Sequence, residues 1–360
     1  MTDPAGGSEV GPVVLRMLQR LAEAGIGPAR AESRQIVAHV LDVSLGDLSL
    51  AELTGRLRVS AEQMHTIETL TERRARRIPL QHVLGRAPFR ALDLSVGEGV
   101  FVPRPETELL VERALELLSE RRAAEQTSDS DGDDAAAVDP ALTDGTRRDV
   151  APRRLRVFEA GTGSAAISLA IATELPHTQV RTVELETAAE AWARRNIVAY
   201  TDALAAADSA VELVAGDAIA DLAVASSSLL PAQPHPRSRA QAAAQMTPGQ
   251  PVAESAGTFD LIVSNPPYVP MGDIPLEPEA RADPDTALYS GADGLDFIRE
   301  LVAPAFAALQ AGGSILLEHT EQQGSDVRTL LETAGFEAAQ THRDLTGRDR
   351  FTEARHPSRH

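Results

Sequence analysis

The stretch that decides the fold is Phe259-Asp260-Leu261-Ile262-Val263-Ser264-Asn265-Pro266-Pro267-Tyr268. Its first half is apolar enough for a strand that is buried on both faces, as in a parallel sheet. Two prolines cannot continue the hydrogen-bonded ladder, so we expect the strand to end at Asn265. Open α/β sheets bind their ligands at the carboxyl ends of strands, and we therefore place the chemistry at this turn.

The Asn-Pro-Pro-Tyr turn carries the groups needed to hold a planar NH2 group. The side-chain oxygen of Asn265 and the carbonyl of Pro266 can each accept one N–H bond. The ring of Tyr268 can lie against the flat face of the same group. Holding both hydrogens in this way aims the nitrogen lone pair at an electrophile. The alternative is a plain turn that ends the strand, because Pro-Pro pairs are common in loops.

Composition narrows the class of protein. The chain has 360 residues, of which 43% are hydrophobic, enough for two domains with sizeable cores. It contains neither Cys nor Lys, which excludes disulfides, a thiol nucleophile, a cysteine zinc site and a lysine base. The net charge of -19 argues against non-specific binding to nucleic acid. We find no membrane-spanning apolar run and no signal-peptide pattern, and expect a cytoplasmic protein without a membrane partner.

Three regions are predicted along the chain. Residues 1–78 form a small helical domain, with apolar residues at helical spacing. Residues 79–106 alternate apolar and polar positions and predict a hairpin that links the domains. Residues 107–360 alternate strands and helices, which predicts a parallel sheet with helices on both faces. Within this last region, the low-complexity stretches at about 123–149 and 223–257 are expected to loop out as insertions.

The elements of the third region are predicted from apolar runs and helical periodicity. Besides the strand before Asn265, strands are expected at 155–160, 180–185, 211–214 and 314–318. Helices are expected at 110–118, 165–175, 188–199, 295–309 and 326–334. In the helical domain, Ser60 and Gln63 form a capping-box pattern at the start of a helix. That helix ends in an Arg cluster, residues 73–77, which is either a solvated face or a docking surface.

The motif at 159–166, Glu-Ala-Gly-Thr-Gly-Ser-Ala-Ala, follows the first strand of the sheet and opens its helix. Glycines there let a ligand approach the backbone. With Glu184 about twenty residues on, the motif also fits a dinucleotide. Asp217, at the end of the third strand, can accept the adenine amino group, which favours a phosphate-free adenosyl cofactor, S-adenosyl-L-methionine, over NAD. Both acids are also candidates for helix caps.

A second motif, Pro103-Arg104-Pro105-Glu106-Thr107-Glu108, precedes an amphipathic helix. The two prolines fix an extended entry to that helix. Arg104 and Glu106 are open to two interpretations, because charged residues at a helix start serve either as caps or as substrate-binding groups.

Taken together, these motifs resemble the HemK/PrmC family, whose members methylate the glutamine in the Gly-Gly-Gln motif of peptide chain release factors. The resemblance covers about 79–355 closely, apart from the two insertions, and the helical domain loosely. It implies an α/β, Rossmann-like class I S-adenosylmethionine-dependent methyltransferase sheet with a small N-terminal helical domain and a linking β-hairpin. Further motifs that carry it are Thr286-Ala287-Leu288, Gly291-Ala292-Asp293-Gly294-Leu295-Asp296 and Leu317-Glu318-His319.

The resemblance also implies roles for individual residues. The residues expected to hold S-adenosyl-L-methionine are Gly161, Thr162, Gly163, Ser164, Ala165, Glu184, Asp217, Ala218 and Asn265. The residues expected to hold the substrate are Asn265, Pro266, Pro267, Tyr268, Phe101, Arg104 and Glu106. Catalysis is assigned to Asn265, Pro266 and Tyr268, and no residue is assigned to a metal.

The sequence departs from the family pattern at three positions. Ala165 stands where a third Gly is usual, and Glu159 where an Asp is usual. The extra methyl at Ala165 would crowd the methionine part of the cofactor, which affects affinity more than cofactor identity. Ala218 lacks the bulk that some relatives place beside the adenine.

The expected reaction is in-line transfer of a methyl group to an amide nitrogen, with orientation and desolvation as the main sources of rate. The expected partners are class 1 release factors, through their Gly-Gly-Gln loop, and no stable nucleic acid. Two alternatives remain at this point. One is methylation of an exocyclic amine of DNA or RNA, which fits the same clamp. The other is a binding module that reads an amide-bearing loop without chemistry.

Overall fold

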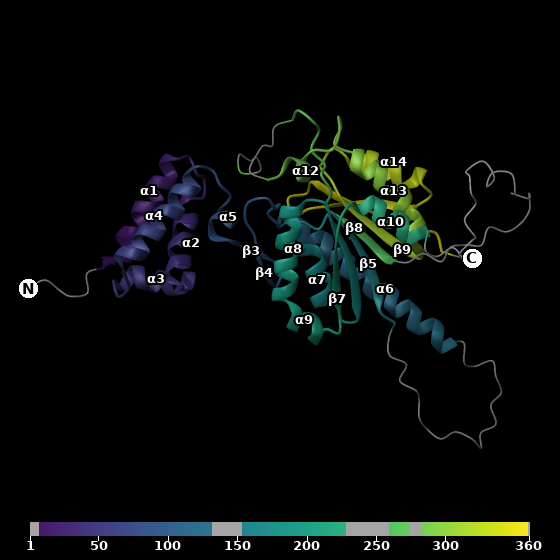
Figure 1. Cartoon of the computed structure of the whole chain (residues 1–360), viewed down its shortest axis with the longest axis horizontal. Coiled ribbons are helices and arrows are strands. Elements are labelled where there is room, and N and C mark those ends of the chain that lie inside the picture. The colour runs from purple at the N-terminus through teal and green to yellow at the C-terminus, as the bar shows by residue number, and fades with distance from the viewer. Residues whose placement is uncertain (1–6, 132–152, 228–258, 274–278, 280–282, 359–360) are drawn as a thin grey trace, which may run out of the picture. The chain divides into compact units, whose positions relative to one another are not determined.

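The computed structural model describes residues 7–131, 153–227, 259–273, 279 and 283–358 (Figure 1). The chain divides into two compact units, and each is described by itself. The first, which we call the helical unit, comprises Met1–Ala87, Asp93–Val102 and Ile274–Pro284. The second, which we call the sheet unit, comprises Pro88–Leu92, Pro103–Asp273 and Asp285–His360. No helix in the described ranges is both long and apolar enough to cross a membrane.

The helical unit is built from short helices around one apolar core. Its helices are α1 (Val10–Glu23), α2 (Ala29–Leu41), α3 (Leu45–Thr54), α4 (Ala61–Ala75) and α5 (Leu80–Leu84). The two-residue strands β1 (Ser8–Glu9) and β2 (Arg58–Val59) pair antiparallel. Buried side chains recur at helical spacing, as Met17 and Leu21 do on α1. The predicted capping box is confirmed, since Ser60 and Gln63 exchange both of its hydrogen bonds at the start of α4.

The Arg cluster at the end of α4 binds its own chain. Arg74 is only 4% exposed and pairs with Glu32 at 2.5 Å and with Glu279 at 2.9 Å. Arg77 also pairs with Glu279, at 3.3 Å. The expectation of a solvated face is therefore wrong for Arg74, because a buried cation must be paired.

The linking hairpin is confirmed. Strands β3 (Arg86–Phe89) and β4 (Leu92–Ser95) form a two-stranded sheet. Their side chains alternate between buried and exposed positions, which is the period-2 pattern that predicted them. The tip of the hairpin, Pro88–Leu92, is grouped with the sheet unit.

The sheet unit contains a seven-stranded sheet in the order β10-β11-β9-β8-β5-β6-β7. The strands are β5 (Leu155–Ala160), β6 (Thr178–Glu184), β7 (Ala210–Ala215), β8 (Phe259–Ser264), β9 (Leu309–Glu318), β10 (Glu337–Arg343) and β11 (Asp349–Arg355). The five predicted strands, β5 to β9, are present and run parallel. Strand β11 is antiparallel to both of its neighbours, so the sheet is mixed, whereas an all-parallel sheet was expected.

Helices cover both faces of the sheet, as predicted. Helix α6 (Thr107–Asp131) packs on α7 (Ala166–Glu174), whereas α10 (Ala218–Ser227), α13 (Asp296–Ala308) and α14 (Gly324–Thr333) form a second layer (Figure 1). The remaining helices of this unit are α8 (Thr187–Ala199), α9 (Thr201–Ala206) and α12 (Asp285–Leu288).

Two predicted insertions begin later than expected. Helix α6 continues through Asp131 and α10 through Ser227, so residues 123–131 and 223–227 are helical. The composition of these residues changes before the helices end, because Ala and polar side chains on a solvated helix leave no apolar period to read. The rest of both stretches lies outside the described residues.

Strand β8 lies at the centre of the core. All six of its residues are buried, and Phe259 packs edge-to-face on Phe158 with ring centroids 5.3 Å apart. Chain order reverses between β5 and β8, where the Ser264 hydroxyl donates to the Ala160 carbonyl at 2.7 Å. This reversal is the switch point at which open α/β sheets bind ligands. The fold therefore brings the glycine motif after β5 and the turn after β8 to the same edge.

Candidate active site

A chain of hydrogen bonds runs from the turn after β8 into the core. The half-buried Asn265 donates from Nδ2 to the Thr107 hydroxyl at 3.2 Å. Thr107, at the first residue of α6, donates in turn to Oε2 of Glu318 at 2.8 Å. The Tyr268 hydroxyl donates to the other oxygen of Glu318, at 3.4 Å. One carboxylate at the end of β9 thus holds both Asn265, through Thr107, and Tyr268.

Two acceptors at this turn are left without a donor. Among the described residues, none donates to Oδ1 of Asn265 or to the carbonyl oxygen of Pro266. Pro266 is buried, and Pro267 beside it is half-buried. These are the two oxygens that the sequence singled out as acceptors for a planar NH2 group, and the turn keeps both available.

The turn is held in place by the segments that follow it. Gln323 donates from Nε2 to the Tyr268 carbonyl at 3.0 Å and to the Asp293 carbonyl at 2.9 Å. Gly294 has φ of +80°, and a Cβ there would lie 2.1 Å from the Tyr268 carbonyl oxygen. Only glycine fits at that position.

The motif Thr286-Ala287-Leu288 also supports the turn through the backbone. The Val269 amide donates to the Leu288 carbonyl at 2.7 Å, and the Ser290 amide donates to the Val269 carbonyl at 3.0 Å. Together with Gly294, these bonds give both motifs a structural role.

The charges around the turn are arranged about a buried acid. Glu318 is 1% exposed, and burial raises its pKa to about 7, while Arg350 opposes the shift and Glu106 adds to it. Burial and the Glu318 carboxylate raise the pKa of Tyr268, against the attraction of Arg350 and Arg104. Arg104 and Glu106, predicted as substrate-binding residues, therefore lie close enough to the turn to act on its ionisable groups.

The glycine motif forms a backbone cradle after β5. Gly161 and Gly163 have φ of +72° and +57°, and a Cβ on either would meet no atom within 4 Å. The amides of Gly161 and Thr162 donate to the Val183 carbonyl at 3.0 and 3.2 Å. The Ser164 carbonyl accepts from Nδ2 of Asn196 at 2.9 Å. The loop is thus fixed from behind and open in front.

Ala165 lies in the left-handed region, with φ of 64°, and is fully buried. A residue with a Cβ pays for this conformation, which glycine adopts freely. The departure from a third glycine therefore costs the loop backbone strain, in addition to the crowding that the sequence predicts.

Glu159 faces the inner side of the loop. It is 1% exposed, and its Oε2 accepts from the hydroxyls of Thr162 at 2.7 Å, of Thr182 at 3.0 Å and of Ser168. Burial raises its pKa to about 7. Its carboxylate is engaged in holding the loop.

Glu184 and the glycine loop are directly bonded. The Gly163 amide donates to Oε2 of Glu184 at 2.7 Å, and the Glu186 amide donates to Oε1 at 3.0 Å. Burial raises the pKa of Glu184. The next residue, Leu185, is 66% exposed, which is unusual for a large apolar side chain and gave no signal in the sequence beyond its place after a strand-end acid.

Asp217 serves as a helix cap. Its Oδ1 accepts from the amides of Ile219 at 2.8 Å and Ala220 at 3.4 Å, at the start of α10. None of the described residues donates to its Oδ2, and its neighbour Ala218 is buried. Phe101 is the one predicted site residue that belongs to the helical unit.

Thr107 and Glu318 were not predicted as site residues. Both lie in motifs that were noted, and Glu318 is an acid at the end of an apolar strand run, which is the same signal that identified Glu184.

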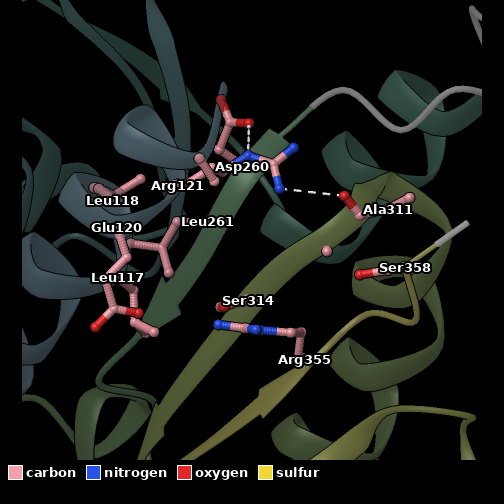
Figure 2. A pocket seen from close by; sticks show the side chains of 12 residues that line it. Leu117, Leu118, Glu120, Arg121, Asp260, Leu261, Ala311, Ser314, Arg355 and Ser358 are labelled. Atoms are coloured by element: carbon pink, nitrogen blue, oxygen red, sulfur yellow. Dashed lines mark hydrogen bonds and ion pairs between the residues drawn. The ribbon is translucent and has the colours of Figure 1, made fainter. Parts of the chain in front are cut away.

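A cavity of about 340 Å³ lies away from this turn, beside the start of β8 (Figure 2). Figure 2 shows Arg121 of α6 bonded to Asp260 and to the Ala311 carbonyl, at 2.5 and 3.2 Å. Asp260 begins β8 and Asn265 follows its last residue, so the cavity and the turn lie at opposite ends of the strand.

Comparison with known proteins identifies the family. A family model described as the PrmC N-terminal domain matches residues 14–85. The release factor glutamine methyltransferase of Bifidobacterium longum is 32% identical over 341 residues, which cover 94% of this chain and 97% of that one. The chain belongs to the release factor glutamine methyltransferase family. The family member from Streptomyces coelicolor is 35% identical, covering 95% of this chain and 96% of that one.

Among solved structures, the 16S rRNA N2 G1207 methyltransferase of Thermus thermophilus is similar with a TM-score of 0.40 and 20% identity. That alignment covers 76% of this chain and 50% of the other. Our description of the fold rests on the strand order given above.

As a member of the release factor glutamine methyltransferase family, the chain is an S-adenosylmethionine-dependent methyltransferase. The groups present fit that cofactor. The backbone beside Gly161 and Gly163 is open, a carboxylate stands at the end of β6, and an exposed apolar side chain, Leu185, follows it.

Proposed function

We propose that this protein methylates the side-chain amide nitrogen of the glutamine in the Gly-Gly-Gln loop of class 1 peptide chain release factors. The observation that carries the proposal is the pair of acceptors at the turn, Oδ1 of Asn265 and the carbonyl oxygen of Pro266. No described residue donates to either. A primary amide has two N–H groups, so two such acceptors can hold both of them. The names of the relatives agree with this substrate.

The residues at the edge of β5 and β6 would hold the cofactor. Bound S-adenosyl-L-methionine supplies a methyl group on a positively charged sulfonium. The open backbone of the glycine loop would receive its methionine part, and Glu184 has lone pairs left to accept from ribose hydroxyls. Leu185 would cover one face of the adenine, and Oδ2 of Asp217 would accept from its amino group. Ala218 would border the same ring.

The turn itself would act by orientation. An amide nitrogen is a weak nucleophile, so holding it in a fixed pose is the main contribution available to the enzyme. Asn265 and Pro266 would bind the two hydrogens, and the Pro267 ring would keep the backbone between them and Tyr268 rigid. Tyr268, fixed by its bond to Glu318, would flank the amide. Arg104, Glu106 and Phe101 would contact the residues around the glutamine.

A protein substrate suits the charge of the chain better than nucleic acid does. The net charge is -19, and a polyanion would be repelled by it. Release factors act where translation occurs, and we accordingly place the enzyme in the cytoplasm.

The proposal is tested with methyl-labelled cofactor. We would incubate the enzyme with a purified class 1 release factor, intact or with the motif glutamine replaced by alanine, and in a parallel reaction with DNA and RNA. We expect label on the intact factor alone. Label on the replaced factor, or on nucleic acid in preference to protein, would overturn the substrate assignment.

A pair of enzyme variants tests the site. Asn265→Ala removes one acceptor and is expected to abolish transfer while cofactor binding, measured by calorimetry, is only partly weakened. Gln322→Ala removes an exposed amide near the same edge and should transfer normally. Normal turnover by Asn265→Ala would contradict the clamp.

A further inference from the structure

Glu318 is a buried acid at the site for which the proposed function has no use. It ends β9, is 1% exposed and accepts from two hydroxyls, those of Thr107 and Tyr268. Burying a carboxylate is costly, so the fold must gain something from it or from the groups that it orders. Its two partners come from α6 and from the turn after β8, and both lie within one residue contact of the substrate acceptors.

The hydrogen bonds through Thr107 can run in one direction only. An ionised carboxylate accepts and never donates, so the single hydroxyl hydrogen of Thr107 is committed to Glu318. The Thr107 oxygen can then only accept. Its other neighbour, Asn265, must therefore turn its NH2 group towards Thr107, as observed at 3.2 Å.

The direction decides which atom of Asn265 remains for a ligand. With Nδ2 spent on Thr107, Oδ1 is left as an acceptor. If the amide turned over, its NH2 group would instead face the N–H groups of the substrate amide, donor against donor. One of the two bonds that hold the substrate nitrogen would then be lost.

We infer that Glu318 is a positioning residue that, through Thr107, fixes Asn265 with its oxygen towards the substrate. This inference rests on the proposed role of Asn265 and adds the group that makes the role possible. Three residues from α6, β8 and β9 share the task. Glu318 touches neither the amide nor the cofactor site; it acts by setting the polarity of a hydrogen-bond chain, and through its second oxygen it also orients the Tyr268 ring.

The sharpest test compares two substitutions at Thr107. Thr107→Val keeps the shape of the side chain and removes the hydroxyl, whereas Thr107→Ser keeps the hydroxyl and removes only a methyl. We expect Thr107→Val to lower kcat about 10- to 100-fold, as loss of a buried hydrogen-bond partner does. Thr107→Ser should stay within about threefold of the parent. Cofactor affinity, measured by calorimetry, should be unchanged in both.

A double variant tests whether Glu318 acts through Thr107. If it does, adding Glu318→Gln to Thr107→Val should lower kcat by much less than the product of the two single effects, because residues in one network are not additive. Fully multiplicative effects would show that Glu318 acts by another route and would overturn the inference.

The failure of this inference is distinguishable from failure of the proposed function. The ratio of kcat between Thr107→Ser and Thr107→Val can be measured on whichever NH2 substrate the parent enzyme methylates. Equal kcat in both variants, or a loss that appears in cofactor affinity instead of kcat, would overturn the positioning role even if release factor proves to be the substrate. Thermal unfolding of each variant identifies any loss that is merely structural.

Discussion

The Gly163 amide donates to the Glu184 carboxylate at 2.7 Å, and this bond joins the loop after β5 to the end of β6. The two parts of the cofactor site are thus coupled before any ligand is present. A ligand that bonds to Glu184 meets a carboxylate whose position is already fixed by two backbone amides. Preorganisation of this kind reduces the entropy lost on binding.

Glu184→Gln should weaken cofactor binding. The substitution keeps the size of the side chain, but replaces one acceptor oxygen with a donor and removes the charge. We expect the Kd of S-adenosyl-L-methionine to rise about 10- to 100-fold, as expected when a charged acceptor is lost. Calorimetry measures it. Glu212→Gln, on the exposed side of β7, is the matched control and should leave Kd unchanged. An unaltered Kd for Glu184→Gln would remove this residue from the cofactor site.

Ala165→Gly should stabilise the protein, although it deletes a buried methyl. The left-handed conformation costs a non-glycine residue about 1–2 kcal/mol, against about 0.5–1 kcal/mol for the extra flexibility of glycine. We therefore expect the free energy of unfolding to rise by about 0.5–1 kcal/mol, with tighter cofactor binding. Urea unfolding measures the first quantity.

The control for Ala165→Gly is Ala170→Gly, in the middle of α7. Ala170 is also fully buried but helical, and glycine there should cost about 1 kcal/mol or more. If both variants lost stability equally, the backbone strain at Ala165 would be absent.

Gly294→Ala should disable the turn. The added Cβ would lie 2.1 Å from the Tyr268 carbonyl oxygen, so the turn or the segment behind it must move. We expect kcat to fall about 100-fold, since misplacement by about 1 Å has that effect. Gly347→Ala has a similar φ, +83° against +80°, but its Cβ would meet no atom within 4 Å. Steady-state kinetics should therefore show a large loss in the first variant and little in the second.

Activity should rise with pH through about 7, the value to which burial raises the pKa of Glu318. Below that pH the protonated carboxyl can donate to Thr107 and release Asn265 from its fixed orientation. The charged or ionisable groups that face Glu318 are Arg350, Glu106 and Tyr268. The pH profile of kcat measures the effect, and Glu318→Gln should lack this inflection. An inflection that persists in the variant would belong to another group.

The sheet was predictable where its strands are buried. Strands β5 to β9 are runs of apolar residues bounded by glycine or polar turns, and β8 could be placed because two prolines end it. Strand β10 was not predictable, since its residues, Glu337–Arg343, are mostly polar and half-exposed at the edge of the sheet. An edge strand needs one paired neighbour and no apolar period.

Part of the site was predictable for a similar reason. Asn265, Glu184 and the glycine loop each stand directly after a strand, so their neighbours in sequence reveal their place. Thr107 and Glu318 are 211 residues apart, and they meet only because β9 lies beside β8 and α6 starts at the same edge. Strand order and side-chain direction decide that contact, and neither can be read from a local pattern.

The pairing of Arg74 with Glu279 means that the helical unit is not encoded by one continuous piece of the chain. A fragment that stops after the hairpin would retain Glu32 but lose Glu279, which lies 205 residues beyond Arg74. The guanidinium would then keep one of its two carboxylate partners while still buried. Exchanging only the first part of the gene between relatives would create the same mismatch. A transplanted helical unit must bring its own 274–284 segment with it.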